Sequence, residues 1–176
     1  MATRRQAREW ALQLLSQLDL NPAPRLDDAL EAFWQQLREL ELERAEVDDR
    51  LEKVLNFDSQ DKSKADAFAA AREFAEERVR GVMEDRAGLD ANLDRRLVNW
   101  PLYRLGTVER NVLRLGFWEL ENCPDIPAPI VINEYVDLAK FFSETKSGRF
   151  VNGVLDKYAR ELKAENSVPE VETFTP

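Results

Sequence analysis

Two segments of this sequence, far apart along the chain, carry the residue types that bind phosphates and unpaired bases. Guanidinium and ammonium groups bind phosphate oxygens, an aromatic ring stacks on a base, and an amide hydrogen-bonds a base edge or a sugar. The combination is compatible with binding of single-stranded RNA, although clustered basic residues are also common on ordinary solvated helix faces. The candidates are Arg4, Arg5 and Arg8 in the first segment, and Lys146, Arg149, Phe150 and Asn152 in the second.

Both segments are locally basic in an acidic chain. The 176 residues have a net charge of −9, yet residues 1–26 carry +2, residues 27–100 carry −8 and residues 101–176 carry −3. Within the last part, residues 143–160 carry +2. Because salt screens a charge beyond about 10 Å, the net charge does not exclude a local surface that binds phosphate.

Other kinds of chemistry lack the residues they need. The chain has no histidine and a single cysteine, Cys123. Histidine is the commonest general base and metal ligand, so we expect no metal site and no nucleophile–histidine pair. No glycine-rich phosphate loop is present, and the acidic residues show no compact catalytic pattern. We therefore expect no enzyme, no cofactor and no small-molecule substrate.

The pattern of apolar residues predicts an all-α protein. Apolar side chains recur at helical spacing through most of the chain, and no strand pattern or internal repeat is convincing. The predicted helices are 3–20, 27–40, 63–86, 89–98, 108–120, 129–142 and 147–162. No apolar run approaches the roughly 20 residues that span a bilayer, and neither a signal peptide nor an internal disulfide is expected. We predict a cytoplasmic protein.

Helix 108–120 is predicted to be central, because apolar residues spread around most of its circumference. Arg110, Arg114 and Glu121 form its one clear polar strip. Glu109 and Glu119 fall among apolar neighbours, where a carboxylate is usually paired within the structure. We favour such pairing for Glu109.

Two regions are expected to lie outside the packed helices. Residues 41–64 are dense in charge and are predicted to extend the second helix and end in a loop at 58–62. Residues 165–176 are polar, contain two prolines, and are predicted to form a disordered tail. One domain over 1–164 is expected.

Three ordered motifs resemble the NusB family. The first is Arg4-Arg5-Gln6-Ala7-Arg8-Glu9, and the second is Val108-Glu109-Arg110-Asn111-Val112-Leu113-Arg114 followed by Glu119-Leu120. The third combines Ile132-Asn133-Glu134 and Leu138-Ala139-Lys140 with Phe150-Val151-Asn152-Gly153-Val154-Leu155-Asp156. The likeness covers about 1–20 and 89–160. Residues 41–64 look like an insertion, and Lys146 stands where relatives often carry an acid.

The resemblance implies a single all-helical domain of two packed bundles, with about seven helices. It implies an antitermination factor that binds the single-stranded boxA element of nascent ribosomal RNA transcripts together with NusE, a small-subunit ribosomal protein. The complex helps RNA polymerase to resist termination. We expect the two basic segments to form one groove for boxA RNA, and NusE to meet Trp118 and Glu119 on another face.

Two alternatives remain at this point. The chain could be a helical scaffold whose acidic surface binds basic proteins and never RNA. It could also be a detached substrate-holding domain of an RNA cytosine methyltransferase. The role of Phe150 is open as well, since its ring could stack on a base or could fasten the start of its helix to the core.

Overall fold

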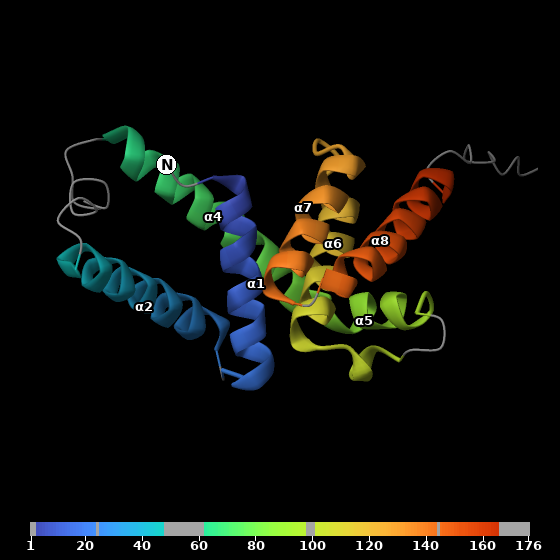
Figure 1. Ribbon diagram of the computed structural model, residues 1–176, viewed down its shortest axis with the longest axis horizontal. Coiled ribbons are helices and arrows are strands. Elements are labelled where there is room, and N and C mark those ends of the chain that lie inside the picture. Colours follow the sequence, from blue (N-terminus) through green and yellow to red (C-terminus); the bar gives the residue numbers. More distant parts are fainter. Residues whose placement is uncertain (1–2, 24, 48–61, 98–100, 144, 166–176) are drawn as a thin grey trace, which may run out of the picture. The chain divides into compact units, whose positions relative to one another are not determined.

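A computed structural model describes residues 3–23, 25–47, 62–97, 101–143 and 145–165, with the side chains of 41–47, 62–64 and 145–146 left out. These residues form seven α-helices and one short 3₁₀-helix, without a strand, which confirms the predicted all-α class (Figure 1). The elements are α1 (Arg4–Leu20), α2 (Leu26–Val47), α4 (Lys62–Glu84), α5 (Arg86–Asp94), η1 (Leu102–Arg104), α6 (Thr107–Asn122), α7 (Ala128–Phe142) and α8 (Thr145–Glu165).

The chain divides into two compact units, Met1–Glu84 and Asp85–Pro176, and each is described by itself. In the first unit α1 packs against α4 and α2. The apolar stripe predicted on α1 is buried along its whole length, as expected from its i, i+3, i+4 spacing. Edge-to-face aromatic contacts then join the three helices, since Trp10 of α1 contacts Trp34 of α2 at 5.4 Å and Phe68 of α4 at 5.5 Å.

In the second unit α6 packs against α5, α7 and α8, so the prediction of a central helix is confirmed. Every residue from Asn111 to Phe117 on this helix is buried. The axes of α6 and α8 approach closely at Gly116, where an added Cβ would lie 2.6 Å from Cδ2 of Leu155. This close approach explains why a glycine stands in the middle of a helix, where it otherwise weakens helix formation.

A buried ion pair joins α5 to α6. Arg114 donates two hydrogen bonds to the Asp90 carboxylate, at 2.7 and 2.8 Å, and a third to Asn111 at 2.9 Å. Arg114 is only 3% exposed. The sequence-based assignment of Arg114 to a solvent-facing polar strip is therefore wrong, because the carboxylate that allows its burial comes from another helix.

The boundaries of some elements also differ from prediction. The break between α4 and α5 lies at Asp85, about three residues before the expected position. The helix α8 begins at Thr145, so Lys146 belongs to its first turn and Ser147 lies inside the helix instead of capping it.

The insertion is helical from 41 to 47, residues 48–61 lie outside the described part, and α4 begins at Lys62. The tail predicted to be disordered lies outside the described residues except for Glu165, the last residue of α8. The single-domain expectation stays a prediction.

Candidate nucleic-acid interface

The first candidate segment lies at the start of α1. The hydroxyl of Thr3 caps the helix by accepting a hydrogen bond from the backbone N–H of Gln6 at 3.2 Å, as its spacing predicted. Arg4 and Arg5 are both exposed in the first turn, where the helix dipole adds positive potential. Arg5 also lies 3.6 Å from the carboxylate of Glu9. Two cations are thus presented at a helix N-terminus, the arrangement that attracts phosphate.

Arg8 differs from its two neighbours because it is only 3% exposed. Its guanidinium carbon lies 5.2 Å from the ring centre of Phe74 in α4, and that of Arg4 lies 5.7 Å from the same ring. Arg78 of α4 stacks on this ring at 3.1 Å. In this structure, contrary to expectation, Arg8 does not offer an open phosphate contact. It packs between α1 and α4 and holds the start of α1 in place.

The second candidate segment forms the first two turns of α8. Arg149 and Asn152 are exposed, and Phe150 is half-buried. Val151 and Leu155 point into the core and are fully buried, so they fix the rotation of the helix. The half-buried ring of Phe150 is compatible with both roles considered for it. The side chain of Lys146 lies outside the described residues.

A carboxylate from α6 holds the turn between α7 and α8. Ser147 donates a hydrogen bond to Oε1 of Glu109 at 2.7 Å, and Ser143 donates a second, short one to the same oxygen. The two hydroxyls lie 3.1 Å from each other. The prediction that Glu109 is paired within the structure is confirmed. This carboxylate fixes the corner from which Arg149 and Phe150 project.

Hydrogen bonding also controls the charge of Glu109. Burial alone would raise its pKa, but the hydrogen bonds from Ser143, Ser147 and its own backbone N–H outweigh burial and hold the pKa below the ordinary 4.5. The carboxylate is therefore ionised at neutral pH. A charged acceptor makes stronger hydrogen bonds than a neutral one, which stabilises the turn.

The two residues predicted to meet a partner lie in different environments. Trp118 is half-buried, whereas Glu119 is fully buried and accepts a hydrogen bond from the hydroxyl of Tyr135 at 2.7 Å. A buried carboxylate in this bond is in no position to contact another protein directly. The expectation for Glu119 is wrong in this respect, because its acceptor role in the core could not be recognised before α7 was placed beside α6.

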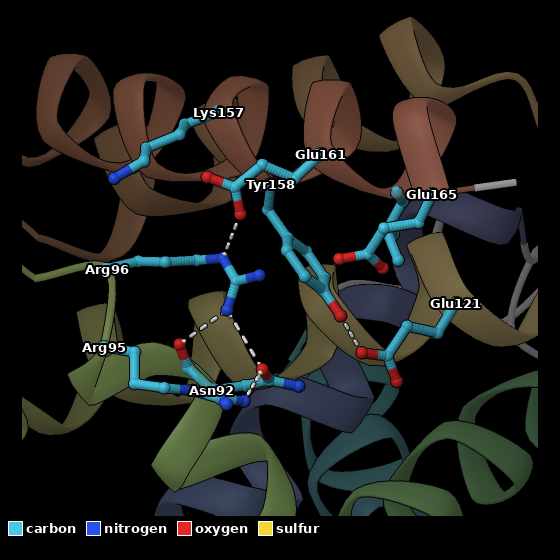
Figure 2. A pocket seen from close by; sticks show the side chains of 9 residues that line it. Asn92, Arg95, Arg96, Glu121, Lys157, Tyr158, Glu161 and Glu165 are labelled. Atoms are coloured by element: carbon cyan, nitrogen blue, oxygen red, sulfur yellow. Dashed lines mark hydrogen bonds and ion pairs between the residues drawn. The ribbon is translucent and has the colours of Figure 1, made fainter. Parts of the chain in front are cut away.

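A polar cavity of about 480 Å³ in the second unit was not predicted from the sequence (Figure 2). Arg96 lies at its centre, donates to Glu161 of α8 at 2.7 Å, and stacks on the ring of Tyr158 at 4.5 Å. Tyr158 in turn donates a short hydrogen bond to Glu121. The full lining is Asn92, Arg95, Arg96, Glu121, Lys157, Tyr158, Glu161, Leu162 and Glu165.

The charges that line this cavity balance in number, and Arg96 and Glu161 form an ion pair among them. Three cations face three carboxylates, and Arg96 also donates at 3.0 Å to the backbone carbonyl of Asn92. Partial burial and then the charge of Asp85 raise the pKa of Glu121 above the ordinary 4.5, against the opposing effect of Arg96. We assign the cavity a structural role, because its network joins α5, α6 and α8. It contains none of the predicted site residues.

Metal binding and membrane insertion find no support in the described part of the chain. No group of three or more potential ligands converges there on a possible metal position. The described helices likewise include none with the length and apolar character needed to cross a membrane.

Comparison with known proteins decides the family. The model of the NusB family matches residues 35–160. The transcription antitermination protein NusB of Myxococcus xanthus (strain DK1622) is 38% identical over 162 residues, which cover 92% of this chain and 98% of that protein. The chain belongs to the NusB family. This membership confirms the predicted resemblance. It also confirms the prediction that the protein is a transcription antitermination factor and not an enzyme.

Solved structures agree with the assignment. NusB of T. maritima has 31% sequence identity and superposes with a TM-score of 0.65 over 92% of this chain and 94% of that one. A structure of the antitermination factors NusB and NusE in complex with double-stranded RNA matches at 25% identity and a TM-score of 0.66, covering 90% and 96% of the two chains. The NusB family model includes Glu109 and the start of α8, whereas the arginines of α1 precede the matched range.

Proposed function

We propose that this chain binds the single-stranded boxA element of nascent ribosomal RNA transcripts together with NusE, within the antitermination complex of RNA polymerase in the bacterial cytoplasm. The observation that carries the proposal is the start of α8, where Arg149 and Asn152 are exposed beside the half-buried ring of Phe150. A cation for phosphate, a ring for a base and an amide for a base edge are the groups that an unpaired strand requires.

The basic start of α1, in the first unit, is the second segment that we propose to contact RNA. Arg4 and Arg5 are exposed and can contact phosphates directly, while Arg8 supports them from beneath. Lys146, in the first turn of α8, adds a further positive charge to the segment that carries Arg149. In the proposed complex both segments contact boxA RNA, so that substitutions in either segment weaken its binding.

The proposal for NusE rests on the solved complex of a relative, in which NusB and NusE are bound together with RNA. We place the NusE contact on a face separate from the RNA, with half-buried Trp118 of α6 as the residue most suited to it. Aromatic side chains of this kind often dominate the energy of protein interfaces. A pull-down of NusE by Trp118→Ala, with and without boxA RNA, tests this placement. If Trp118→Ala retains as much NusE as the natural chain, NusE does not bind at Trp118.

A filter-binding titration with boxA RNA and a scrambled RNA of equal length tests the function itself. For an unpaired strand, the slope of log affinity against log salt is about −0.7 for each phosphate contact. With three or four contacts we expect a slope of about −2 to −3 and a clear preference for boxA. Equal binding of both RNAs, or none, would favour the alternative of a scaffold for basic proteins.

Phe150→Ala tests the ring at the centre of the proposed site. If the ring stacks on a base, its removal weakens binding by about 1–3 kcal/mol and leaves the helical circular dichroism unchanged. Unchanged affinity with lowered thermal stability would instead assign Phe150 to the core.

A further inference from the structure

A second aromatic ring projects from the corner where α7 meets α8. Phe141, in the last turn of α7, is 74% exposed. Its ring contacts the half-buried ring of Phe142 edge-on, with centroids 4.9 Å apart. This contact restricts the motion of Phe141 while leaving most of its surface open to solvent.

The surroundings of Phe141 connect it to the start of α8. The aliphatic chain of Lys140 lies against Gly148, where an added Cβ would be 2.6 Å from Cγ of Lys140. Gly148 directly precedes Arg149 and Phe150, so the last turn of α7 and the first turns of α8 form one corner. The side chain of Lys140 is half exposed, and its amine lies 3.1 Å from the carboxylate of Asp137. Lys140 therefore adds a cationic side chain to the corner that carries Phe141.

The exposed face of α7 is better suited to a base than to another protein. Ile130 is the next exposed large apolar residue on this helix, and 11 residues place it about 16 Å from Phe141 along the axis. Between them the helix presents Asn133 and Asp137. A protein interface needs a continuous apolar centre, whereas a single unpaired base needs one ring with cations nearby.

We propose that Phe141 is a stacking residue for an unpaired base, which extends the RNA surface of α8 across the end of α7. The inference rests on the proposed function and adds a base position to it. The strand would pass from Phe150 to Phe141, with Lys140 and Arg149 close to its phosphates.

The test compares Phe141→Ala and Phe141→Trp with Tyr103→Ala in RNA binding by the full chain. Tyr103 is 75% exposed in η1 and is a matched control for the loss of an exposed ring. We expect Phe141→Ala to weaken binding of boxA RNA about 5- to 150-fold, the range for one stacked base. Phe141→Trp should restore binding, and Tyr103→Ala should leave it unchanged.

Two further readouts distinguish stacking from a structural effect. The slope of log affinity against log salt should be unchanged in Phe141→Ala, because no charge is lost. A series of RNAs with one abasic nucleotide each should contain one position that weakens binding by the natural chain but adds nothing in Phe141→Ala.

The outcomes separate this inference from the proposed function. If Phe141→Ala binds as well as the natural chain while Phe150→Ala is impaired, the role of Phe141 is wrong and the proposed function stands. If the natural chain shows no preference for boxA over scrambled RNA, the proposed function fails and this inference fails with it.

Discussion

Ser147, in the first turn of α8, donates a hydrogen bond of 2.7 Å to the carboxylate of Glu109, near the start of α6. The same carboxylate oxygen accepts from Ser143, at the end of α7. One charged group therefore ties together three helices of the second unit at the corner that carries Arg149 and Phe150. The corner is held by a partly buried hydrogen-bond network, which distinguishes it from an ordinary basic surface.

Glu109→Gln is expected to lower stability at neutral pH. Because the folded pKa of Glu109 lies below its ordinary value, the ionised group stabilises the fold above pH 4.5, and this contribution is lost as the pH falls through the folded pKa. Urea unfolding at pH 7 and at successively lower pH should show that the difference in free energy of unfolding between the natural chain and Glu109→Gln becomes smaller as the pH falls. Glu39→Gln, at an exposed site of α2, is the control. A loss of stability in Glu109→Gln that does not change with pH would contradict this account, and so would an equal loss in Glu39→Gln.

The same substitution is expected to weaken RNA binding. Removal of a negative charge near a phosphate site should strengthen binding if charge alone mattered. If Glu109 instead positions the corner, Glu109→Gln loosens the turn and lowers affinity severalfold despite the more favourable charge. Fluorescence anisotropy with labelled boxA RNA at fixed salt shows whether the substitution raises or lowers RNA affinity. Tighter binding would show that Glu109 has no positioning role.

Asp90→Asn is expected to destabilise the second unit by about 2–4 kcal/mol, since it leaves Arg114 buried with a weaker acceptor. Asp156→Asn is the matched control, because Asp156 forms an exposed pair with Arg160 that we expect to be worth less than about 0.5 kcal/mol. Urea unfolding of both variants at pH 7 provides the comparison. If both variants lose the same free energy of unfolding, the burial of the pair between Asp90 and Arg114 does not contribute to stability.

Glu121→Gln should have the opposite pH behaviour from Glu109→Gln. Its raised pKa means that the fold favours the protonated form, so this contribution to stability is present at low pH and is lost as the pH rises through the folded pKa. The variant should therefore melt at a higher temperature than the natural chain at pH 7 and show no such gain at pH 4. A gain that is independent of pH would point to a cause other than this carboxyl group.

Helical periodicity was enough to predict the all-α class, the buried stripe of α1 and the central position of α6. Pairing of Glu109 could be predicted from its apolar neighbours, but the identity of its partners could not. The errors at Arg114, Arg8 and Glu119 share one cause. Each is a polar group whose burial depends on a side chain from another helix, and a pattern along one helix contains no information about that side chain.

The central claim is that the start of α1 and the start of α8 each contact boxA RNA. Salt titrations of boxA binding by Arg5→Gln and by Arg149→Gln test it most directly, with Arg160→Gln, exposed farther along α8, as the control. We expect each of the first two variants to weaken binding and to reduce the steepness of the salt slope by about 0.7, and the control to change neither. An unchanged affinity and slope in either Arg5→Gln or Arg149→Gln would show that the segment carrying that arginine does not contact the RNA.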